Sequence, residues 1–296
     1  MNELATLQRI LPIFQQRPEI TTGPGDDCAV INFGNTCLLA AVDQMAAGIH
    51  YYPDTKPERI AAKLLKRNLS DIAAMGGTPA YALLSLASKR ADDDWFNAFY
   101  YGLEQEARRW NVSICGGDLC ALPADGLEDV MSLTILGWCQ PGNACLRSNA
   151  KAGDLLYATG CFGDSLKSGH HLDFAPRLAE GAFLAQGFTS AMIDVSDGLL
   201  LDASRIAEAS KLALIIDMPT IPLRNDTDTA SAMCDGEDYE LLFAISPDAA
   251  QQLERLWDFE TKLTCIGHFE SGYGVTSTDG HNLLKEFKTG YEHRNT

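Results

Sequence analysis

The 296-residue sequence predicts two domains that mix helices and strands, of class α+β or α/β. Short apolar runs of strand length alternate in both halves with segments whose apolar residues recur every three or four positions. Between these halves, residues 140–151 contain Pro141-Gly142 and several polar side chains, which is typical of a linker. We therefore expect an N-terminal domain over residues 1–140 and a C-terminal α/β domain over residues 141–296.

Helices of the first half are predicted from apolar spacing and capping residues. An amphipathic helix is expected at the start, where apolar side chains recur at helical spacing: Leu4, Leu7, Leu11 and Phe14. Thr55-Lys56-Pro57-Glu58 has the form of a capping box with an early proline, so a helix should follow to about Met75. A third helix is expected where aromatic and aliphatic residues share one face: Trp95, Phe96, Phe99, Leu103 and Trp110.

Strands are predicted from short apolar runs. In the first half they are expected at residues 28–32, 37–42, 80–87, 112–115 and 130–138, with 112–115 buried. In the second half they are expected at residues 154–159, 191–194, 212–217 and 241–245. After a turn at residues 160–163, helical segments should continue to about residue 184. Another helix should cover residues 199–210, and residues 220–232 should be irregular.

Composition excludes several classes of protein. A hydrophobic content of 46% with 21% charged residues is typical of a globular chain. The net charge of -17 argues against a nucleic-acid-binding surface, which requires a basic stripe. Nine cysteines without a C-x-x-C pair argue against a zinc site or a disulfide framework, and no apolar run is long enough to span a membrane. We expect a cytoplasmic protein.

Aspartate recurs in five short motifs, mostly where an apolar run ends or a helix is expected to begin. They are Gly25-Asp26-Asp27, Val42-Asp43, Ser70-Asp71, Gly116-Gly117-Asp118 and Asp194-Val195-Ser196-Asp197-Gly198. Each motif alone is equally well explained as a turn or a helix cap. Together, short carboxylates on tight turns provide the hard oxygen ligands that Mg²⁺ ions around a triphosphate require.

The familiar catalytic signatures do not occur in the sequence. It contains no P-loop, dinucleotide fingerprint, G-x-S-x-G elbow, H-E-x-x-H motif or protein-kinase signature. With these signatures absent, the remaining interpretation is phosphate chemistry organised by carboxylates and metal ions. The candidate metal ligands are Asp27, Asp43, Asp71, Asp118 and Asp197, with Asp194 as a further candidate. Arg147 either binds a phosphate group or is a solvated loop residue.

These motifs resemble those of thiamine-monophosphate kinases and occur in the same order. The strings are Gly25-Asp26-Asp27-Cys28-Ala29, Asn68-Leu69-Ser70-Asp71-Ile72-Ala73-Ala74-Met75-Gly76, Gly116-Gly117-Asp118, Ile193-Asp194-Val195-Ser196-Asp197-Gly198-Leu199, Gly236-Glu237-Asp238-Tyr239-Glu240 and Gly290-Tyr291-Glu292-His293. The second string is the most specific, and the resemblance spans essentially the whole chain. The family belongs to a superfamily with aminoimidazole ribonucleotide synthetase and selenophosphate synthetase.

The resemblance implies both an architecture and a reaction. The N-terminal domain would dimerise through its sheet, the C-terminal domain would be α/β, and ATP with several Mg²⁺ ions would lie between the domains. The enzyme would transfer the γ-phosphoryl group of ATP onto thiamine monophosphate, directly and in line, to give thiamine diphosphate.

The same resemblance implies a role for each matching position. Metal ligands would be Asp27, Asp43, Asp71, Asp118, Asp194 and Asp197. ATP would contact Tyr100, Gly117, Asp118, Arg147 and Ser196. Thiamine monophosphate would contact His50, Glu237 and Tyr291.

Some positions depart from the family's pattern. Hydroxyl residues are usual at two positions that here are Ala41 and Val42. Threonine is common at two others, which here are Gln44 and Leu119, and Arg294 stands where an aromatic residue is often found. Two alternatives therefore stay open. The chain could be a paralogous ATP-dependent kinase or synthetase with another acceptor, or a nucleotide-binding protein without catalysis. An acceptor screen and a turnover assay would distinguish them.

Overall fold

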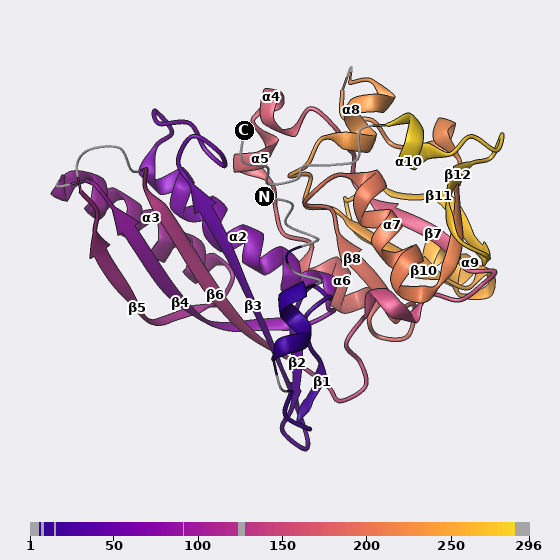
Figure 1. The fold of residues 1–296 in the computed structure, drawn as a ribbon, viewed down its shortest axis with the longest axis horizontal. Coiled ribbons are helices and arrows are strands. Elements are labelled where there is room, and N and C mark those ends of the chain that lie inside the picture. Colours follow the sequence, from indigo (N-terminus) through magenta and orange to yellow (C-terminus); the bar gives the residue numbers. More distant parts are fainter. Residues whose placement is uncertain are drawn as a thin grey trace.

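The computed structural model describes residues 6, 9–14, 16–90, 92–123, 128–225 and 227–287. Within these ranges the chain forms two six-stranded sheets, one from each half of the sequence. Figure 1 shows the two halves side by side, with helix α2 (Pro57–Ala74) reaching from the first toward the second. The fold is therefore α+β, and each half has a sheet and helices of its own.

The N-terminal sheet has the order β1-β2-β3-β6-β4-β5. Its strands are β1 (Ile20–Thr22), β2 (Ala29–Asn32), β3 (Cys37–Ala46), β4 (Thr78–Ser88), β5 (Ser113–Ala121) and β6 (Val130–Cys139). Helices α2 and α3 (Asp93–Arg109) cover one face, where alternate strand residues such as Leu84 and Leu133 are buried. The opposite face carries exposed apolar side chains, among them Val42, Leu83 and Trp138.

The C-terminal sheet has the order β12-β9-β11-β7-β10-β8 and is antiparallel except for the β9–β12 pair. Its strands are β7 (Leu155–Thr159), β8 (Ala191–Asp194), β9 (Leu212–Ile216), β10 (Leu241–Ile245), β11 (Leu263–Ser271) and β12 (Gly274–Ser277). Both faces are covered, because alternate residues of β10 enter two different cores: Leu242 packs with helix α7 (Leu199–Ser210) and Phe243 with α9 (Pro247–Leu256).

The remaining helices are short. They are η1 (Leu11–Ile13), η2 (Arg147–Asn149), η3 (Met218–Thr220), α4 (Ser165–Ser168), α5 (His170–Asp173), α6 (Leu178–Leu184), α8 (Thr229–Cys234) and α10 (Leu283–Glu286). No helix of the described ranges combines the length and the apolar content that crossing a membrane requires.

Helix α2 joins the two halves through its C-terminal end. Ala73 and Ala74 belong to the same core as Leu184 of α6 and Phe243 of β10. The approach is close, because a Cβ atom at Gly181 would lie 2.2 Å from the carbonyl oxygen of Ala73. Only glycine allows α6 to pack this tightly, so the two halves meet along α2.

The structure differs from several predictions. Strand β3 runs on to Ala46, so Asp43 lies within a strand and not at its end. The segment expected to be a buried strand at 112–115 belongs to an edge strand that is exposed at every residue from Ser113 to Ala121. Strands β11 and β12 and helix α9 were not anticipated, and α8 begins inside the segment expected to be irregular. Leu4 and Leu7 lie outside the described residues.

Candidate active site

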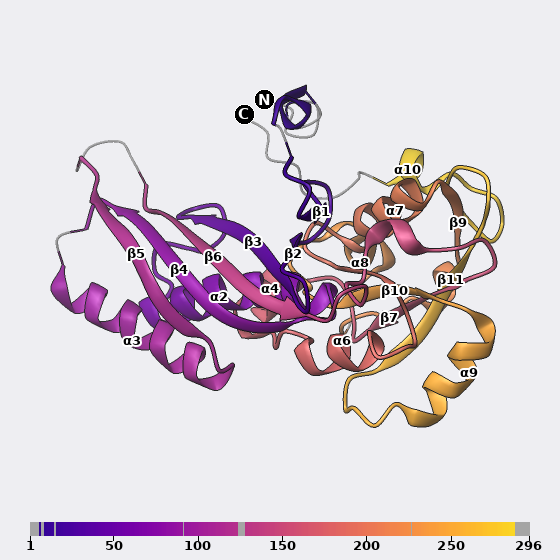
Figure 2. The same cartoon turned by 90° about the horizontal axis from the view of Figure 1, so that it is seen from below.

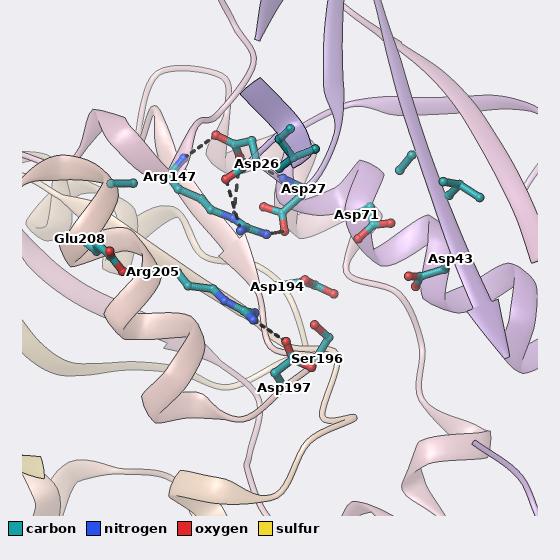
Figure 3. A pocket seen from close by; sticks show the side chains of 15 residues that line it. Asp26, Asp27, Asp43, Asp71, Arg147, Asp194, Ser196, Asp197, Arg205 and Glu208 are labelled. Atoms are coloured by element: carbon teal, nitrogen blue, oxygen red, sulfur yellow. Dashed lines mark hydrogen bonds and ion pairs between the residues drawn. The ribbon is translucent and has the colours of Figure 1, made fainter. Parts of the chain in front are cut away.

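Three aspartates from distant parts of the sequence meet where the two halves join. Asp27 precedes β2, Asp71 lies in the last turns of α2, and Asp194 ends β8. One carboxylate oxygen from each lies within 4.8 Å of the others. Figure 3 shows the three side chains pointing toward a common space. The positions follow from α2, which carries Asp71 from the first half to the end of β8.

The cluster holds more negative charge than its own contacts balance. Burial, with the neighbouring carboxylates of Asp43, Asp194 and Asp27, raises the pKa of Asp71 well above its ordinary value. Burial and Asp27 likewise raise the pKa of Asp194, although a 2.6 Å hydrogen bond from the Ser70 hydroxyl opposes the shift. The Oδ2 atom of Asp27 is buried and accepts no hydrogen bond from the described residues. A cation would satisfy all three groups.

A cavity of about 530 Å³ opens over this cluster. It is lined by residues of both halves: Asp26, Asp27, Ala41, Val42, Asp43, Asp71, Arg147, Asp194, Ser196, Asp197 and Arg205 among them. Asp43 reaches the cavity from β3, where the Arg67 side chain of α2 lies 3.2 Å from its carboxylate. The structure thus brings five of the six predicted metal-binding aspartates to one cavity.

Arg147 fixes the loop that carries Asp26 and Asp27. Its Nη2 atom donates to Asp27 Oδ1 at 2.6 Å, and its backbone nitrogen donates to Asp26 Oδ2 at 3.1 Å. Burial and the adjacent Asp27 raise the pKa of Asp26 to about 7. Since Arg147 stands at the start of η2, directly after the linker, its guanidinium ties the second half to the first and lies in the wall of the cavity.

The loop between β8 and α7 is held by Asp202, a residue that the sequence motifs did not reveal. Its buried Oδ2 accepts hydrogen bonds from the backbone nitrogens of Ser196, Asp197 and Gly198, at 3.0 to 3.2 Å. Arg205 contacts both Asp202 and Asp197, the latter at 2.6 Å. The sequence feature that could have revealed Asp202 is an acidic residue in the first turn of α7 followed by an arginine three positions later.

His50 and Glu237 lie on opposite halves and share one partner. Lys63 of α2 lies 2.6 Å from the Glu237 carboxylate and donates to the His50 carbonyl oxygen at 2.6 Å. The Glu237 backbone nitrogen also donates to Ser196 O at 2.8 Å, so Glu237 is directly bonded to a residue of the cavity wall.

Comparison with known proteins identifies the family. Residues 25–139 match the family described as AIR synthase related protein, N-terminal domain, and residues 148–280 match the corresponding C-terminal domain. The thiamine-monophosphate kinase of Salmonella typhimurium is 33% identical over 309 residues, covering 94% of this chain and 93% of that protein. The relative from Rhodopirellula baltica is also 33% identical, over 95% and 94% of the two chains. The chain belongs to the thiamine-monophosphate kinase family.

Solved structures of the same family have the same fold. The structure of AaThiL complexed with AMPPCP and TMP superposes with a TM-score of 0.86 at 25% identity, covering 99% of this chain and 97% of that one. The thiamine-monophosphate kinase of Stenotrophomonas maltophilia superposes with a TM-score of 0.76 at 30% identity, covering 95% and 97%.

The remaining predicted residues of this kinase-family chain lie elsewhere. Gly117 and Asp118 are on β5 and the half-exposed Tyr100 is on α3, and none of the three lines the cavity in the described chain. Asp118 is nearly level with Asp43 along the sheet, but three strand spacings away, about 14 Å. Tyr291 and Arg294 lie outside the described residues.

Proposed function

We propose that the protein phosphorylates thiamine monophosphate to thiamine diphosphate with ATP as the phosphoryl donor. The observation that carries this proposal is a cavity at which aspartates from both halves meet Arg147, in a chain of this kinase family. Its curated relatives are named thiamine-monophosphate kinase, and AaThiL was solved with AMPPCP and TMP. These names support both the donor and the acceptor.

Mg²⁺ is the metal that the carboxylate set fits best. The ligands are all hard oxygens, and the buried Oδ2 of Asp27 has no hydrogen-bond donor among the described residues. We propose that Asp27, Asp71 and Asp194 hold Mg²⁺, with Asp43 and Asp197 at the edges of the same cavity. Bound Mg²⁺ would supply positive charge to the phosphate oxygens during transfer.

The chain's own residues position the reactants. The backbone nitrogens of residues 196–198 already donate to Asp202. We assign phosphate recognition to the Ser196 hydroxyl and to the Arg147 guanidinium, whose buried Nε atom has no hydrogen-bond partner among the described residues. His50 and Glu237 would hold the acceptor, with its phosphate facing the donor. Transfer is then direct and in line, because positioning and charge are sufficient for this chemistry. A phosphoenzyme trapped from radiolabelled ATP would contradict direct transfer.

A homodimer would complete the site. Strand β5 is a fully exposed edge strand, and the uncovered face of its sheet carries Val42, Leu83 and Trp138. A second copy packed on this face would bury these side chains and bring its own Asp118 toward the cavity, which the single chain does not do. A cytoplasmic location belongs to the same proposal and is supported by nine cysteines without a disulfide.

The decisive experiment is a turnover assay with purified protein, ATP, Mg²⁺ and thiamine monophosphate, with thiamine diphosphate detected directly. Absence of product would refute the proposed activity, and turnover of another phosphorylated acceptor instead would favour the paralogous reaction. Ala41 and Val42 motivate that second candidate, because they bring apolar side chains to the cavity wall.

The dimer has a separate test. Asp71→Ala and Asp118→Ala should each be inactive alone. If the partner supplies Asp118, mixing the two variants restores activity, because each mixed dimer contains one intact site. If Asp118 acts within its own chain, both sites of a mixed dimer lack an aspartate and no activity returns.

A further inference from the structure

Helix α2 carries two lysines whose side chains are withdrawn from solvent. Lys63 has 0% of its surface exposed and Lys66 has 5%. Burying an ammonium group is costly unless it is paired and hydrogen-bonded. The pKa of Lys63 shows this cost, since burial lowers it to about 8 although Glu237 acts in the opposite direction. The contacts of a lysine buried in this way must compensate for the cost of its burial.

The contacts of Lys63 join two segments that are far apart in the sequence. On one side it donates to the His50 carbonyl oxygen at 2.6 Å, in the turn that follows β3. On the other side its Nζ atom lies 2.6 Å from Glu237 Oε1, in the segment between α8 and β10. Helix α2 therefore links, through one side chain, the two residues proposed to hold the acceptor.

The segment that carries Glu237 needs such a contact. Glu237 and Tyr239 both have left-handed backbone conformations, with φ of 65° and 52°. Non-glycine residues adopt this conformation at a cost, which the surrounding structure must offset. The Glu237 side chain is 17% exposed, so it stands at the edge of the buried region with Lys63 behind it.

We propose that Lys63 is a positioning residue for the acceptor, which holds the Glu237 carboxylate and the His50 turn at a fixed separation. Lys63 is fully buried, whereas the Glu237 side chain that it contacts is 17% exposed, so Lys63 acts through the Glu237 carboxylate and the His50 turn. This inference rests on the proposed function, because it assigns Lys63 to the acceptor side of that site.

Lys66 provides a matched control. It lies on the same helix, it is almost equally buried, and burial also lowers its pKa to about 8. Its Nζ atom, however, donates to the carbonyl oxygens of Leu172 and Phe174, both at 2.8 Å, and to neither proposed acceptor residue. Removing Lys66 therefore tests the loss of a buried lysine without the loss of the Glu237 contact.

The test is a set of four variants: Lys63→Met, Glu237→Gln, the double variant of these two, and Lys66→Met. For each we would measure KM for ATP and for thiamine monophosphate, kcat, and the equilibrium affinity for thiamine monophosphate by calorimetry. Lys63→Met is expected to weaken acceptor binding about tenfold, because a charge-assisted hydrogen bond is lost, and to change KM for ATP less than about twofold. Lys66→Met is expected to lower stability without this difference between the two substrates.

The double variant decides whether Lys63 acts through Glu237. Its loss of affinity for thiamine monophosphate should be smaller than the product of the two single losses, because the part of the Lys63 effect that passes through the Glu237 carboxylate is already gone, and only the part that passes through the His50 turn is added. It leaves neither charge buried without its partner, so it is expected to fold even if Lys63→Met does not. A double variant whose loss equals the product of the two single losses, or equal losses for ATP and acceptor in Lys63→Met, would overturn the inference.

The experiments distinguish a wrong role for Lys63 from a wrong proposed function. If the proposed function is wrong, the unaltered protein neither binds nor phosphorylates thiamine monophosphate, and the assignment of Lys63 falls with it. A fully active protein whose Lys63 variants show no selective loss of acceptor affinity refutes only the role of Lys63.

Discussion

Replacing Asp71 with asparagine should stabilise the protein in the absence of metal while removing its activity. The carboxylate of Asp71 has an oxygen within 4.8 Å of oxygens of Asp27 and Asp194. Two unit charges at that separation repel by about 3.5 kcal/mol for an effective dielectric constant of about 20. The folded protein relieves part of this repulsion by binding a proton, so we expect a net gain of about 1–3 kcal/mol at pH 7.

The gain should depend on pH with a definite sign. Burial and the neighbouring carboxylates raise the pKa of Asp71 in the folded state, whereas the unfolded chain has a value of about 4. The folded protein therefore binds more protons than the unfolded chain above pH 4, and its stability falls as the pH rises. The advantage of Asp71→Asn should grow over the same range and vanish below about pH 4.

Unfolding by a chemical denaturant at several pH values, with EDTA present to remove metal ions, measures this effect. A second series with Mg²⁺ measures how much the metal stabilises each protein. Mg²⁺ should stabilise the unaltered protein more than Asp71→Asn, because the variant has lost a ligand. Asp258→Asn is the control, since Asp258 is exposed and lies outside the cluster. If Asp71→Asn unfolds more readily than the unaltered protein at pH 7 without metal, the aspartates do not repel one another as argued.

Three further predictions concern the framework around the site. Asp202→Ala removes three hydrogen bonds to the loop of Ser196, so the free energy of unfolding should fall by about 2–3 kcal/mol and kcat should fall with it. Gly181→Ala puts a Cβ atom 2.2 Å from the Ala73 carbonyl oxygen, so thermal unfolding should show a loss of about 1–3 kcal/mol. Burial lowers the pKa of His170 from 6.5 to about 4, so this histidine should destabilise the fold as the pH falls from 6.5 to 4. His170→Gln should flatten that pH dependence by at most about 1.4 kcal/mol per pH unit; an unchanged profile would contradict it.

Much of the fold was predictable because local patterns encode it. Apolar runs located most strands of both halves, and the early proline marked the start of α2, which the structure confirms. The predicted capping box is wrong, because the N-cap is Lys56 and no side chain caps the helix. The exposed edge strand β5 was mistaken for a buried one, because Val112 to Cys115 is an apolar run and its exposure depends on which strands flank it. Strand order is a property of the whole sheet, and no short segment contains it.

The sequence by itself determined the kind of chemistry and the family. Aspartates beside glycine and serine, without any other catalytic signature, indicate phosphate chemistry with metal ions wherever they lie in space. Only the tertiary structure decided which of them meet. Asp27, Asp71 and Asp194 converge because α2 packs against both halves, whereas Asp118 lies about 14 Å from Asp43 within one chain. The roles of Lys63 and Asp202 could not be predicted from the sequence, for the same physical reason. The role of a buried charged residue depends on the groups that it contacts, and the packing of the chain determines which groups those are.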